Sequence, residues 1–154
     1  MSRIPVKMSA VLLTGHGGFE KLRYQEDVDV PSAAAGKVLI KVLAAGVNNT
    51  DINTRTAWYS KAVTGETSTG GAEGFETADD DDGSWSGTPL AFPRIQGADC
   101  CGEIVTVGEG VDDNRIGERV LVRTMQQAAV DYQPFKCWTV GSECGRFRSI
   151  YACL

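Results

Sequence analysis

The chain has 154 residues, of which 42% are hydrophobic and 23% charged, and its formal net charge is −5. This length suits one domain with a hydrophobic core and is too short for two full domains. The negative charge and the scattered basic residues exclude a nucleic-acid partner, because backbone binding requires concentrated Lys and Arg. No apolar run approaches the roughly 20 residues of a membrane helix, and no secretory apolar stretch is present, so we expect a cytoplasmic protein with no membrane partner.

Short strands separated by glycine turns dominate the predicted structure. Apolar and β-branched runs predict strands at 9–13, 22–27, 38–43, 102–107 and 119–122, with strand-forming sequence already resuming at Ile95. After the third strand, Asn49-Thr50-Asp51 is typical of a helix cap and leads into a short helix that ends at Thr56. The pattern predicts a mainly β (β-rich α+β) fold, a partly open β-barrel with one or two short helices.

Residues 60–90 interrupt the strand pattern. The segment is rich in Gly, Thr, Glu and Asp and contains the acidic run 79–82. Such a composition buries little apolar surface and predicts a long, mobile surface loop. Trp58 and Trp85 flank the acidic run and are expected to cap the barrel, with a place at a substrate mouth as the alternative.

The five cysteines form no zinc pattern. Cys100 and Cys101 are adjacent, and neighbouring side chains of a strand point to opposite faces, so the two cannot grip one metal without distortion. We expect buried free thiols. The turn 15–18 lacks the glycine spacing of a phosphate-binding loop, and its His16 is assigned no catalytic role.

Four glycine-containing segments carry a resemblance to a known family. They are Ala-Gly-Val-Asn-Asn-Thr-Asp at 45–51, Pro-Arg-Ile-Gln-Gly-Ala-Asp-Cys-Cys-Gly at 93–102, Val-Gly-Glu-Gly-Val at 107–111 and Gly-Glu-Arg-Val at 117–120. In this order and spacing they resemble the N-terminal GroES-like domain of the medium-chain dehydrogenase/reductase superfamily. Within its zinc-type alcohol dehydrogenase family, the likeness is to the zinc-independent, quinone-oxidoreductase-like branch. The resemblance implies a GroES-like domain over 8–144, with residues 60–90 as a loop insertion.

The resemblance also implies that a second domain is missing from this chain. In full-length members a doubly wound Rossmann domain holds NADP(H) or NAD(H), and its glycine fingerprint does not occur here. We therefore expect a truncated member that binds no cofactor tightly. Residues 145–154 depart from the family's pattern and are interpreted as a frameshifted, non-native tail.

Zinc is not expected, again by resemblance. Asn48 stands where the zinc enzymes have a cysteine ligand, and Gly97-Ala98-Asp99 stands where they have Gly-His-Glu. A catalytic zinc site needs about three such ligands. A structural zinc site is not expected either, because 124–143 supplies only Cys137 before Cys144.

Asn48 and Tyr59 are the candidate catalytic residues. The segment from Gly46 to Tyr59 is similar to the Gly-Val-Asn-x-x-Asp-x-x-x-Arg-x-Gly-x-Tyr pattern of quinone oxidoreductases, with Ala57 in place of the third Gly. The resemblance implies that the Asn48 amide lies beside the nicotinamide or a substrate oxygen, where donors stabilise developing negative charge. Tyr59 would then lie on the pocket wall.

Three further residues are expected to support this pocket structurally. Asp51 and Arg55 are interpreted as an ion pair or helix cap, and Asp99 as a neighbouring support. The alternative for the start of the segment is that Asn48 and Asn49 merely form a turn.

Together these features predict the substrate-side domain of an NAD(P)H-dependent oxidoreductase acting on a small carbonyl, enone or quinone, inactive as this isolated chain. The resemblance is to an enzyme family, but because the cofactor-binding domain is missing, whether this chain counts as an enzyme stays open. Two alternatives stay open, namely a stand-alone GroES-like module that binds a partner protein through its acidic loop, and an inert truncated product. Without a second domain the chain would expose apolar surface and self-associate.

Overall fold

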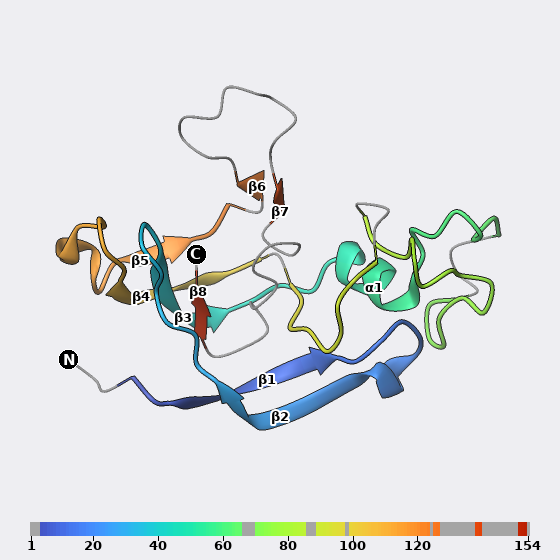
Figure 1. The fold of residues 1–154 in the computed structure, drawn as a ribbon, viewed down its shortest axis with the longest axis horizontal. Helices are drawn as coiled ribbons and strands as arrows, with labels where there is room; N and C mark the ends of the chain where they lie inside the picture. The colour runs from blue at the N-terminus through green and yellow to red at the C-terminus, as the bar shows by residue number, and fades with distance from the viewer. Residues whose placement is uncertain are drawn as a thin grey trace. The chain divides into compact units, whose positions relative to one another are not determined.

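The structure, a computed structural model, describes residues 4–65, 70–85, 89–97 and 99–123, together with the backbone of 125–126, 138–139 and 151–153. Most of its elements are strands (Figure 1). In chain order they are β1 (Lys7–Leu13), η1 (Phe19–Lys21), β2 (Leu22–Asp29), β3 (Val38–Ala44), α1 (Asn49–Thr56), β4 (Cys101–Val107), η2 (Asp113–Arg115), β5 (Arg119–Leu121), β6 (Met125–Gln126), β7 (Trp138–Thr139) and β8 (Tyr151–Cys153).

The chain divides into two compact units. The sheet unit comprises residues 1–10, 25–46 and 95–154, and the helix unit comprises residues 11–24 and 47–94. β1 and β2 pair with each other and each runs through both units. No helix in the described part of the chain is both long and apolar enough to cross a membrane.

A four-stranded antiparallel sheet forms the centre of the sheet unit. Its order is β5-β4-β3-β8, so β8 near the end of the chain lies beside β3 (Figure 1). The register of β3 with β4 runs from Val38 opposite Val107 to Ala44 opposite Cys101, with irregularities after Leu39 and after Val42. Among the described strands this order ends at β5 and β8 and does not close into a ring. The predicted β-rich, partly open fold with a short helix is confirmed.

Branched apolar side chains make the core of this sheet. Ile40, Cys100 and Ile104 are buried together, and five partly buried valines pack against them, namely Val38, Val42, Val107, Val120 and Val122. Gly102 lets β3 and β4 approach, because a Cβ there would collide with the Ile40 side chain and the Lys41 carbonyl.

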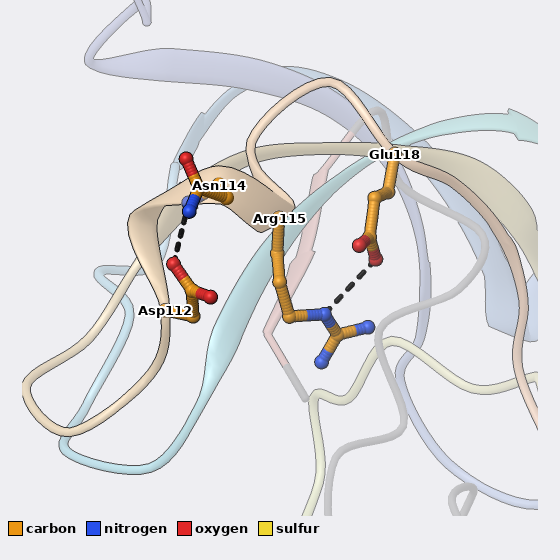
Figure 2. A network of polar contacts seen from close by, with 4 residues as sticks. All are labelled: Asp112, Asn114, Arg115 and Glu118. Carbon is orange, nitrogen blue, oxygen red and sulfur yellow. Dashed lines mark hydrogen bonds and ion pairs between the residues drawn. The ribbon is translucent and has the colours of Figure 1, made fainter.

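Polar contacts shape the turn that leads from β4 to β5. The Asp112 carboxylate accepts a hydrogen bond from the backbone N–H of Asn114 at 2.9 Å and so starts η2. Arg115 then pairs with Glu118 at 2.9 Å, with both side chains nearly half exposed (Figure 2). Gly117 has φ of 93°, a left-handed backbone that favours glycine, and the chain returns to pair β5 with β4.

Several element limits differ from the sequence prediction. β1 begins two residues earlier than expected, and β4 begins at Cys101, one residue before the strand predicted at 102–107. The predicted helix is confirmed, but its cap is Asn48 instead of the following residues. Within the predicted non-native tail, Tyr151–Cys153 form β8, while 145–150 and Leu154 lie outside the described residues. The non-native origin of that tail stays a prediction.

Candidate functional site

The helix unit carries both predicted catalytic residues on α1 or its flanks. Asn48 is the N-cap, with an extended backbone, and the residue is exposed. Asp51 accepts a hydrogen bond from the Asn48 backbone N–H at 2.8 Å, and the two residues form a reciprocal capping box. Only 6% of Asp51 is exposed. The sequence therefore starts the helix here because two of its otherwise unpaired N–H groups gain side-chain acceptors.

Arg55 is a buried cation that binds backbone carbonyls. Only 3% of this residue is exposed. Its guanidinium donates to the carbonyls of Gly17 at 2.6 Å, Gly71 at 2.5 Å and Ala72 at 3.3 Å. Its Cζ also lies 4.6 Å from the centre of the Phe19 ring. Burial lowers the pKa of this guanidinium from its usual value, yet Arg stays charged in proteins. Arg55 thus ties two loops to α1.

The other end of α1 carries an aromatic cluster, which we define as Trp58, Tyr59 and Trp85. α1 ends at Thr56, and its C-cap Ala57 lies in the left-handed region with φ of 59°. The rings of Tyr59 and Trp58 are 5.5 Å apart and those of Tyr59 and Trp85 are also 5.5 Å apart, both in edge-to-face geometry. Tyr59 and Asn48 flank opposite ends of a helix of eight residues, which corresponds to about 12 Å. The structure therefore brings Tyr59 together with Trp85 and does not place it at the Asn48 end of the helix.

Ser60 joins the acidic loop to the end of α1. Its hydroxyl accepts hydrogen bonds from the backbone N–H of Asp79 at 2.9 Å and of Ala62 at 3.3 Å. Asp82 accepts from the Lys61 backbone N–H at 3.0 Å. Hydrogen bonds from the Ser60 side chain and from that N–H lower the pKa of Asp82. The described part of the predicted loop forms turns that are hydrogen-bonded to the residues just after α1. The mobility of the loop stays a prediction.

Asp99 lies in the sheet unit, against the glycine that follows β3. A Cβ built on Gly46 would meet the Asp99 carboxylate oxygen Oδ2 at 2.8 Å. The neighbouring thiols of Cys100 and Cys101 are free, the first buried and the second partly exposed. Burial, and to a lesser degree the adjacent Cys101, raises the pKa of Cys100 to about 11. A thiol with this pKa is protonated at neutral pH and is a poor nucleophile or metal ligand.

The glycine turn that follows β1 is occupied by its own carboxylate. The Gly18 backbone N–H donates to Glu20 at 3.1 Å. His16 contacts both α1 and Phe92. Its Nδ1 lies 2.7 Å from the Thr54 carbonyl oxygen, and the centre of its ring lies 5.0 Å from the centre of the Phe92 ring. A bound phosphate would meet the Glu20 charge here, so this turn does not suit an anion.

Comparison with known proteins decides the family. Residues 34–153 match the family model described as the alcohol dehydrogenase GroES-like domain. The chain belongs to this family. The resemblance to the GroES-like domain of medium-chain dehydrogenases/reductases is thereby confirmed.

Individual relatives of this GroES-like domain are longer oxidoreductases. The chain is 42% identical to a protein of Sinorhizobium meliloti 1021 described as an alcohol dehydrogenase, whose crystal structure it matches with a TM-score of 0.73 over 98% of this chain and 38% of that one. It is 32% identical to the quinone oxidoreductase of Rattus norvegicus over 73% of this chain and 26% of that protein. It is 26% identical to the chloroplastic NADPH-dependent alkenal/one oxidoreductase of Arabidopsis thaliana over 81% of this chain and 26% of that protein. The chain thus spans about a quarter of the length of these two curated relatives.

Sequence reasoning missed the importance of the loop contacts. Ser60 and the carbonyls of Gly71 and Ala72 gave no signal, because serine and glycine in a polar stretch are typical of any loop. The sequence shows Trp85 beside the acidic run, but not its contact with Tyr59. That contact joins residues 26 positions apart, and local sequence patterns do not contain this information.

Proposed function

We propose that this chain is the substrate-side domain of a zinc-independent, NAD(P)H-dependent oxidoreductase that reduces a carbonyl, enone or quinone. The observation that carries the proposal is the exposed residue Asn48 at the start of α1 in a chain of this family. The names of the rat quinone oxidoreductase and the Arabidopsis alkenal/one oxidoreductase support the substrate classes named.

The chemistry favours a donor at this position. Hydride addition to a conjugated carbonyl leaves negative charge on its oxygen, and a fixed hydrogen-bond donor stabilises that charge. An Asn side chain has a carbonyl oxygen that can cap a helix and an NH2 group that can donate. The positive end of the α1 dipole is already met by the Asp51 carboxylate, so the Asn48 NH2 group is the donor on which the proposal depends. Asn48 can therefore act as helix cap and as oxyanion donor at once.

A nicotinamide cofactor would supply the hydride, and within the described residues Asn48 offers it a point of contact. The Asn48 amide suits the nicotinamide carboxamide, since each group both donates and accepts. The turn at Gly18 does not suit the pyrophosphate, because Glu20 occupies its N–H. We propose that the phosphate-binding residues lie outside this chain.

Independence from zinc is also part of the proposal. Among the residues that the structure describes, no group of three or more His, Cys, Asp or Glu is placed to hold a metal ion. Cys137 and Cys144 lie outside those residues. Activity that survives extensive chelation would support this part of the proposal.

A chimera tests the proposal as a whole. The matching N-terminal segment of the Sinorhizobium protein is replaced by residues 1–144 of this chain, which leaves that protein's remaining domain intact. We expect the purified chimera to oxidise NADPH or NADH in the presence of a quinone or alkenal, with a chelator present. A folded chimera that binds the nucleotide but reduces none of these compounds would overturn the proposal. A defined ring of isolated chains in size-exclusion chromatography would favour the partner-binding module instead.

A further inference from the structure

The aromatic cluster has an exposed ring on a fixed support. Trp85 is 74% exposed, which is unusual for a side chain of its size. Its ring meets Tyr59 at an interplanar angle of 90°, and Tyr59 in turn meets Trp58 at 69°. Edge-to-face contacts of this kind fix the direction of each ring and leave a broad apolar face of Trp85 open to a ligand.

The backbone before Trp85 is packed directly on the end of α1. Gly83 is buried, and Ser84 is only 4% exposed. A Cβ on Gly83 would lie 2.7 Å from His16 Nε2 and 3.0 Å from the Ala57 Cβ. The base of Trp85 is therefore held while its ring is exposed. A pre-positioned ring loses little conformational freedom when a ligand stacks on it.

We propose that the aromatic cluster binds the ring system of a neutral, planar, polycyclic conjugated carbonyl compound, with Trp85 as the specificity-determining residue. This inference rests on the proposed function, whose substrate class it narrows. Indole and phenol rings have electron-rich faces, whereas a quinone ring is flat and electron-poor, so an offset stack between them is favourable.

The length of α1 favours more than one ring. The cluster lies at the C-terminal end of the helix and Asn48 at the N-terminal end, separated by about 12 Å of helix. A substrate that contacts residues at both ends of α1 must be extended. A fused-ring quinone meets this requirement better than a single ring does.

Negative charge beside the cluster favours a neutral ligand. Ser60 directly follows Tyr59 and is bonded to the acidic loop through Asp79 and Asp82. Asp82 is ionised at neutral pH, as an ordinary Asp carboxyl is, and hydrogen bonds from Ser60 and the Lys61 N–H lower its pKa further. An anionic ring compound would be repelled here, and the repulsion should weaken as salt screens it.

Binding to the full chain tests this inference without catalysis. Equilibrium dialysis, read by ligand absorbance, compares 2-(hydroxymethyl)anthraquinone with its anionic analogue anthraquinone-2-sulfonate. We expect saturable binding of the neutral compound, weaker binding of the sulfonate, and weaker binding of the single-ring duroquinone. The duroquinone ring is fully methylated, which suppresses addition of the free thiols.

Variants then assign the binding to Trp85. Trp85→Leu should weaken binding of the neutral anthraquinone by roughly tenfold, and Trp85→Phe, which keeps a ring, by about threefold or less. Tyr24→Leu is the matched control, because it removes another exposed ring (64% exposed) outside the cluster, and it should leave binding unchanged. Equal binding to Trp85→Leu and the wild-type chain would overturn the inference, as would preference for the sulfonate.

The binding experiment and the chimera experiment test the two proposals separately. Turnover by the chimera without saturable anthraquinone binding would overturn the role of the aromatic cluster and leave the oxidoreductase proposal intact. Binding that is lost in Trp85→Leu would support the cluster even if the chimera transferred no hydride.

Discussion

Two arginines show how burial decides what a charged side chain contributes. Arg55 is 3% exposed and donates to three carbonyls, whereas Arg115 makes an exposed pair with Glu118 (Figure 2). We predict that Arg55→Met lowers the free energy of unfolding by about 3 kcal/mol, because buried carbonyls lose a charged donor. Arg55→Lys should recover part of this loss.

The matched control is Arg115→Met, which should cost less than about 1 kcal/mol because exposed ion pairs contribute little. Urea denaturation of the three variants measures both effects. Equal losses at the two positions would contradict the role given to Arg55.

Cys100 is predicted to lower the stability of the folded protein at alkaline pH. Its pKa is raised by burial from the usual 9.0 to about 11 in the folded chain. Above pH 9 the unfolded chain loses this proton before the folded one does, so the free energy of unfolding should fall as pH rises from about 9 to about 11. The free energy of unfolding should fall by about 2 kcal/mol over this range, and Cys100 should have no effect on its pH dependence well below pH 9.

Cys100→Ala removes this titration and should flatten the stability profile above pH 9, although the lost methylene-sized volume lowers stability at every pH. Thermal or urea unfolding across this pH range checks the difference in slope. An unchanged slope in the variant would contradict the assignment to Cys100.

At the scale of elements, strand patterns were predictable and side-chain contacts across loops were not. The run 38–43 predicted β3 because branched residues in sequence already define a strand. Capping residues at 49–51 predict a helix at this point of the chain because caps depend on nearby residues, although the N-cap itself is Asn48. By contrast, the sequence predicts that Arg55 pairs with Asp51 or caps the helix, and its guanidinium donates to loop carbonyls 16 or more positions away.

Replacing Ser60 tests whether this residue holds the acidic loop against the end of α1. Ser60→Ala removes the acceptor for the Asp79 backbone N–H and the donor to Asp82, so the acidic loop should open more often. We predict faster cleavage by a Glu-specific protease after Glu73 and Glu76. Cleavage after Glu103 in β4 serves as the internal control and should not change. Uniform acceleration at all sites would indicate global destabilisation instead.

At the scale of the whole molecule, exposed apolar side chains predict self-association. Leu121 is 84% exposed on β5, which ends the hydrogen-bonded order of its sheet, whereas Val6 is similarly exposed (76%) but lies outside any strand. Exposed apolar edge strands tend to pair with other chains. Sedimentation velocity should show concentration-dependent association that Leu121→Lys reduces. Val6→Lys, outside any strand, is the control, and a wild-type chain that stays monomeric at every concentration would contradict the prediction.

We propose that the Asn48 amide donates a hydrogen bond to the reacting oxygen of the substrate in addition to capping α1. The most direct test compares Asn48→Ser with Asn48→Ala in the chimera. Serine caps a helix as well as asparagine does but lacks the amide, whereas alanine provides neither. We predict that Asn48→Ser keeps the wild-type free energy of unfolding and lowers kcat/KM about 100-fold, as expected for the loss of one oxyanion donor. Wild-type kcat/KM in Asn48→Ser, with loss only in the destabilised Asn48→Ala, would show that Asn48 is a helix cap alone.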